Sequence, residues 1–135
     1  MANALFNFGR ESFLGGDLAW DSDNIKIVLV DHGSDTPVAA TDQHLSDIGA
    51  GARIATSGNL ASKTITNGVA DAADVTLTTV TGASVESIVV YQDTGTASTS
   101  ILIAFIDTAT GLPVTPNGGD ITVVWDSGSS KIFKL

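Results

Sequence analysis

The chain of 135 residues contains no cysteine, few cations and only two glutamates. The absence of cysteine excludes disulfides, cysteine-ligated zinc and a thiol nucleophile. Because there is no run of about 18 or more apolar residues, we expect no transmembrane helix. The first ten residues lack the basic start of a signal peptide, so we expect a protein made in a cytosol.

The net charge is −9, from 6 Lys+Arg and 15 Asp+Glu. DNA and RNA bind proteins through cations that displace counterions, so this balance disfavours nucleic acid as a partner, and an anionic membrane surface for the same reason. The acids other than Glu11 and Glu86 are aspartates, which favour turns and caps over helix interiors. Abundant Ser, Thr, Val and Gly favour strands and turns as well. The composition therefore predicts an all-β domain.

Three short apolar runs, residues 25–31, 85–92 and 100–106, are rich in β-branched side chains and bounded by turn residues. This pattern is typical of strands, and the run at 25–31 is expected to be buried on both faces. Shorter strands are predicted at 52–56, 59–66, 69–73, 74–80, 121–125 and 131–135. The Asn67-Gly68 pair predicts a tight hairpin turn, and we expect the last two strands to form a hairpin. The spacing of these strands indicates a sandwich or barrel.

Residues 2–14 are the best helix candidate, and Gly15-Gly16 is a plausible stop. We expect a single domain over residues 1–135, with a helical segment at 1–16 and a β-sandwich body at 17–135. A sandwich buries its inner faces by itself, so we predict that the apolar side chains of this segment form an interface with a neighbouring subunit or another protein. The alternative is that the helix caps one open end of the sandwich. The predicted interface residues are Leu5, Phe6, Phe8, Phe13, Leu14 and Trp20.

The patterns that could carry chemistry are weak. The group of Asp31, His32, Asp35, His44 and Asp47 contains metal-ligand types but has no short histidine spacing. The segment Asp93-Thr94-Gly95 superficially resembles the catalytic motif of aspartic proteases, but its flanks favour a hairpin turn. A Gly-x-Ser-x-Gly elbow and the phosphate-binding glycine motifs are absent from the sequence. We therefore predict no enzyme activity, no catalytic residue, no metal and no cofactor.

Several segments are similar to those of small virion proteins of tailed bacteriophages. One starts the chain, Asn-Ala-Leu-Phe-Asn-Phe-Gly-Arg-Glu-Ser-Phe-Leu-Gly-Gly-Asp at residues 3–17, and is followed by Ile-Lys-Ile-Val-Leu-Val-Asp at 25–31. Others are Val-Val-Tyr-Gln-Asp-Thr-Gly-Thr-Ala at 89–97 and the segments at 106–114, 117–123 and 130–135. The resemblance covers nearly the whole chain. Some members of this group resemble head decoration, or cement, proteins, which bind the outside of the mature capsid.

The resemblance implies a jelly-roll-like β-sandwich of about eight strands, made in the bacterial host cytoplasm and located on the capsid exterior. Its expected partners are the major capsid protein and further copies of itself. A homotrimer is expected, because icosahedral shells present local three-fold positions and oligomers are usually symmetric. One alternative is a subunit of the tail or of the neck that joins head to tail. A hydrolytic or carbohydrate-binding module is a further alternative that the sequence supports less.

Overall fold

The computed structural model describes residues 3–135, and this part of the chain is mostly β. The prediction of an all-β domain with one short helix is confirmed. The 3₁₀ turns η1 (Leu45–Asp47) and η2 (Ala50–Ala52) lie between Val30 and Arg53. In chain order, the helix and strands are β1 (Ala4–Leu5), α1 (Asn7–Gly15), β2 (Ile25–Val30), β3 (Arg53–Thr56), β4 (Thr64–Thr66), β5 (Val69–Asp71), β6 (Val75–Leu77), β7 (Ser87–Gln92), β8 (Leu102–Ile106), β9 (Ile121–Val123) and β10 (Phe133–Lys134).

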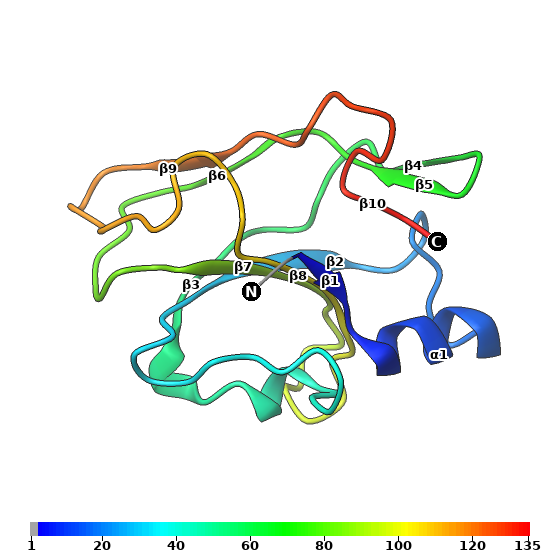
Figure 1. Ribbon diagram of the computed structural model, residues 1–135, viewed down its shortest axis with the longest axis horizontal. Helices are drawn as coiled ribbons and strands as arrows, with labels where there is room; N and C mark the ends of the chain where they lie inside the picture. The colour runs from blue at the N-terminus through cyan, green and yellow to red at the C-terminus, as the bar shows by residue number, and fades with distance from the viewer. Residues whose placement is uncertain (1–2) are drawn as a thin grey trace.

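The strands form one large and two small antiparallel sheets. The large sheet has five strands in the order β1-β8-β7-β2-β3, and the small sheets have the orders β10-β5-β4 and β6-β9. Figure 1 shows both small sheets over one face of the large sheet, and the loop with η1 and η2 over the opposite face. The arrangement is therefore sandwich-like, while the jelly-roll strand order stays a prediction.

The large sheet is buried on both faces, as predicted for the run at 25–31. Side chains of a strand point alternately to the two faces of its sheet. Ile27 and Leu29 of β2 accordingly face the core beneath the small sheets, whereas Val28 and Val30 belong to a second core on the opposite face. Strand β7 pairs with β2 in matching register, with Val89 opposite Val28. Double burial explains why these strands are continuous apolar runs with little alternation.

The N-terminal segment differs from the predicted helix at 2–14. Ala2 lies outside the described residues, and Ala4–Leu5 forms the edge strand β1, paired with β8. The helix begins only at Asn7, because the amide of Phe6 still donates to the carbonyl of Ile103 in β8. It ends as predicted, with Gly16 in the left-handed conformation at φ 85°.

Gly9 lies at the point where α1 touches β8. A Cβ atom at this position would be 2.5 Å from the carbonyl oxygen of Leu102 and 3.1 Å from the Cα of Ile103. The absence of a side chain thus lets the helix rest directly on the strand backbone, at some cost in helix propensity.

The predicted C-terminal hairpin is wrong. Strand β9 pairs with β6, and β10 pairs with β5, because residues 124–132 cross from one small sheet to the other. The predicted Asn67-Gly68 turn is confirmed: it joins β4 to β5, and both residues have positive φ, 53° and 77°. Among residues 3–135, no helix has the length and hydrophobicity needed to cross a membrane.

Candidate functional site

The structure places the predicted interface residues in very different environments. Phe6 is 0% exposed and Trp20 is 3% exposed, so the prediction that these two side chains are available to a neighbouring subunit is wrong. The reason is the register of β1, which carries Phe6 into the core on the loop-covered face of the large sheet. Leu5, Phe8 and Phe13 are half-buried against the other core, while Leu14 is 89% exposed. Of these six residues, only Leu14 has a largely exposed apolar side chain.

Phe13 and Trp20 attach the N-terminal segment to the small sheet that contains β10. The ring of Phe133 packs against Phe13 at a centroid distance of 5.9 Å and meets Trp20 edge-on at 5.3 Å. The indole N–H of Trp20 donates to the carbonyl of Asp71 in β5 at 3.1 Å. This segment therefore covers one end of the sandwich, which was the alternative to the interface hypothesis.

The acidic groups of the loop between β2 and β3 hold its turns. Asp31 accepts hydrogen bonds from the amide of Gly33 at 2.8 Å and from the hydroxyl of Ser34 at 3.0 Å. Asp35 accepts from the amide of Gly49 at 2.8 Å. Such side-chain bonds to nearby backbone are what Asp contributes to turns.

Asp47 closes the first turn of η1. It accepts hydrogen bonds from the amide of His44 at 3.0 Å and from that of Gln43 at 2.8 Å. The bond from His44, followed by that from Gln43, holds the pKa of the Asp47 carboxyl below its usual range. For the nearby Asp42, burial is the main cause of a raised pKa, with the charges of Asp47 and Asp35 adding to it. This loop therefore carries concentrated negative charge.

The two histidines point into separate surroundings. The Nε2 of His32 lies 2.8 Å from the hydroxyl of Ser87, and its ring stacks on Phe105 at a centroid distance of 5.8 Å. His44 instead packs against Phe8, at 5.1 Å. In the part of the chain that the structure describes, there is no group of three or more His, Cys, Asp or Glu that could hold a metal ion. The side chains that are of metal-ligand type in the sequence, such as His32 and His44, therefore make separate contacts.

Asp93 is part of a turn, as its flanks predicted. It forms an ion pair with Lys26 at 2.9 Å and accepts the amide of Gly95 at 3.0 Å. The hydrogen bond from Lys26, followed by that from Gly95, lowers the pKa of Asp93. These contacts hold the connection that leaves β7 against the start of β2, where the amide of Asp93 also donates to the carbonyl of Asn24.

A wide groove lies between the β1 edge of the large sheet and the segment that leads from β9 to β10. Its volume is about 920 Å³. Its lining includes buried side chains of the core beneath the small sheets, among them Ile88 and Phe133. We call it the edge groove. Its more exposed lining includes Asn3, Ala4, Leu5, Arg10, Ile106, Thr110, Thr122, Val124, Lys131, Ile132 and Lys134.

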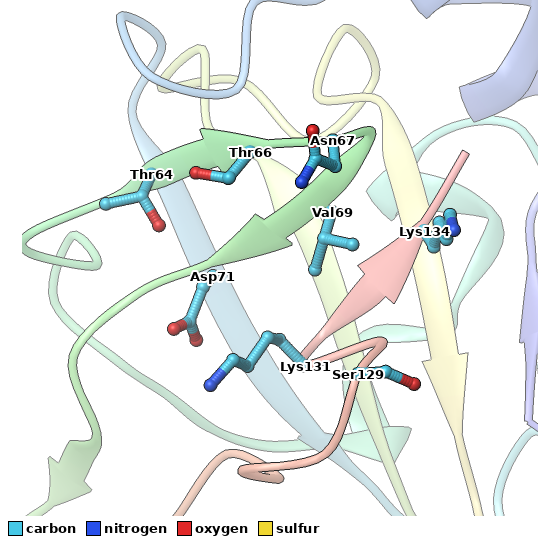
Figure 2. Close-up of a pocket in the computed structure, with 8 residues that line it drawn as sticks. All are labelled: Thr64, Thr66, Asn67, Val69, Asp71, Ser129, Lys131 and Lys134. Atoms are coloured by element: carbon cyan, nitrogen blue, oxygen red, sulfur yellow. The ribbon is translucent and has the colours of Figure 1, made fainter.

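A second, smaller hollow of about 470 Å³ lies on the outer face of the sheet β10-β5-β4. Thr64, Thr66 and Asn67 border it on one side, and Lys131 on the other (Figure 2). Figure 2 shows Lys131 extending toward the side of the sheet that carries Asp71, while Lys134 lies on the far side of β10. The residues that line this hollow are polar apart from Val69.

The sequence analysis missed the edge groove. Val124 is 70% exposed on its rim although it follows the buried Val123 in a continuous apolar run. Two of the lining cations, Lys131 and Lys134, stand close together in the sequence, and this pair was the available signal. The third, Arg10, comes from α1, and only the fold brings it to the same groove.

Comparison with known proteins found no family model and no curated protein that matches this chain.

Proposed function

We propose that the chain is a structural virion protein of a tailed bacteriophage that decorates the outside of the capsid by binding the major capsid protein. The resemblance of its segments to phage virion proteins is the starting point. The observation that carries the proposal is how the reactive side chains are used. Asp31, Asp35 and Asp47 hold turns, and His32 is stacked within the fold. These groups make contacts within the fold, which suits a protein whose role is to bind.

A decoration protein stabilises a shell by binding across the boundaries between its subunits. Binding to the assembled state alone shifts the equilibrium toward that state by mass action. A sheet buried on both faces gives the rigidity that such a clamp needs, because a yielding domain would dissipate the strain between subunits. We further propose a homotrimer at the local three-fold positions of the capsid exterior, made in the bacterial cytoplasm, with no catalytic residue, metal or cofactor.

A reconstruction of the intact phage particle tests the location. Density for this fold on the head surface supports the proposal, and density in the tail or neck contradicts it in favour of the alternative structural role. Particles with and without the protein are then compared during heating and osmotic shock. Those without it are expected to release DNA at lower temperature, and equal survival would contradict the stabilising role.

Light scattering tests the trimer separately, both on the purified protein and on protein eluted from capsids. A mass of three chains is the expected result. A single chain in both samples would contradict the trimer while leaving the capsid location open to the reconstruction.

A further inference from the structure

The edge groove exposes the interior of the sandwich at one side. Strand β1 ends the large sheet, so one side of β1 has no neighbouring strand within the described part of the chain. Above it, the segment after β9 runs to β10 without joining the large sheet. The groove lies between these two borders.

The groove offers apolar contact along its length. Leu5, Ile106 and Ile132 are half-buried side chains that pack on the core from its walls. Val124 stands on the rim with 70% of its surface exposed. The volume of about 920 Å³ is in the range of sites that enclose a ligand. Apolar side chains of an extended segment could be buried here without displacing the core.

The charge of the groove is opposite to that of the molecule. Arg10, Lys131 and Lys134 line it, and these are three of the chain's six cations. Asp126 is the acidic residue among the lining residues, although the chain as a whole carries 15 acids and a net charge of −9. Cations gathered around an apolar cleft favour an acidic occupant and orient it.

We infer that the edge groove binds an extended acidic segment of a partner protein, which adds as a strand beside β1. Strand addition supplies main-chain hydrogen bonds at an open sheet edge, while alternate side chains enter pockets. In such a segment, every second side chain is apolar and lies over the groove floor. The carboxylates between them face Arg10 and Lys134 at the rim. This inference concerns the chemistry of the occupant and is tested without capsids, so it can fail independently of the proposed virion role.

The probe is a fluorescein-labelled synthetic peptide of eight residues in which valine alternates with glutamate. Fluorescence anisotropy is expected to show saturable binding to the full-length protein. A peptide of the same length that alternates valine with lysine is expected not to bind. Absence of saturable binding by the acidic peptide, or equal binding of both peptides, overturns the inference.

The variant R10Q/K134Q removes two cations of the groove and lowers the net charge by two units. Lys63, outside the groove, serves as the matched control, since K63E lowers the net charge by the same two units. We expect affinity to fall about fivefold in R10Q/K134Q and to stay near the original value in K63E. Equal losses in the two variants would show a general effect of charge and overturn the inference.

V124D tests the apolar wall, because Val124 is exposed and its replacement leaves the core intact. V124D is expected to lower the affinity for the acidic peptide further than R10Q/K134Q does. Unchanged affinity counts against binding in the groove. A second copy of the chain is the competing occupant. If light scattering shows a dimer that R10Q/K134Q and V124D both dissociate, the groove is a self-association surface and the inference is wrong.

Discussion

Trp20 and Trp125 donate their indole N–H groups to two backbone carbonyls in the same stretch of chain, those of Asp71 and Ala73, each at 3.1 Å. Trp20 comes from the connector after α1, whereas Trp125 comes from the segment after β9. Both side chains are buried, with 3% and 9% of their surface exposed. Segments near the two ends of the chain are thus tied to one short stretch of the small-sheet layer.

Replacing either tryptophan by phenylalanine is expected to destabilise the fold by about 1–3 kcal/mol, because a carbonyl loses its donor and the smaller ring leaves space. Urea denaturation of W20F and W125F measures these losses. The two residues share a segment, so the double variant is expected to deviate from the sum of the single effects. Strictly additive, negligible losses would contradict this account of the layer.

Gly9→Ala is expected to destabilise the protein by about 1–3 kcal/mol, although alanine is the better helix former. The added Cβ would meet the carbonyl oxygen of Leu102 at 2.5 Å, and neither backbone can give way cheaply. Gly15→Ala in the same helix is the matched control, since its Cβ would meet nothing closer than 3.8 Å. Thermal melts should show a clear loss for Gly9→Ala and none for Gly15→Ala. A stabilised Gly9→Ala variant would show that α1 does not rest on β8.

Phe6→Ala is expected to lower the free energy of unfolding by about 3–5 kcal/mol. The substitution empties a fully buried site between the large sheet and the loop that covers this face. Leu14→Ser, at an exposed position of the same segment, is expected to change stability by less than about 0.5 kcal/mol. A chain that starts at Gly15 should fail to give a cooperative melt by circular dichroism. If the truncated chain folds as the full chain does, the N-terminal segment is an appendage and the interface hypothesis regains its basis.

Asp47→Ala is expected to destabilise the protein at neutral pH by no more than about 1 kcal/mol, since the carboxylate is exposed. Its pKa in the folded state lies below the ordinary value of 3.8, chiefly because His44 and Gln43 donate amide hydrogen bonds to it. The folded state therefore binds this proton less tightly than the unfolded chain. The stabilisation is complete above pH 3.8 and disappears as the pH falls through the lowered pKa.

The measurement for Asp47 is urea denaturation of the variant and the original chain between pH 7 and pH 2.5. The difference between them should shrink at the acid end. Leu14→Ser, at an exposed position with no titratable group, is the control and should show no such convergence. A constant difference for Asp47→Ala across this range would contradict the capping role.

The strands that the sequence predicted well are those whose residues are buried on both faces. The apolar runs that became β2, β7 and β8 were visible because double burial demands apolar side chains without alternation. The Asn67-Gly68 turn was visible because its conformation depends on two neighbouring residues. In each case, the residues that determine the local structure are only a few positions apart in the sequence.

The pairing of β9 and β10 could not be predicted in the same way. Both are short strands, and their partners, β6 and β5, lie far away in the sequence. The apolar pattern of the N-terminal segment also did not show that a short strand precedes the helix. Phe6 enters the core because β1 pairs with β8, and no local pattern specifies that pairing. The edge groove depends on the same distant pairings, so it became visible only in three dimensions.

The position of β1 has a consequence for synthesis. The side chain of Asn3 accepts hydrogen bonds from the amides of Asp107 and Thr108, which lie 104 and 105 residues further along the chain. At translation rates of about 5–20 residues per second, β1 leaves the ribosome roughly 5 to 20 s before its partner β8. During this interval, Phe6 has no core to enter and is open to chaperones or to aggregation. Slower translation therefore prolongs the vulnerable period of this chain rather than helping it to fold.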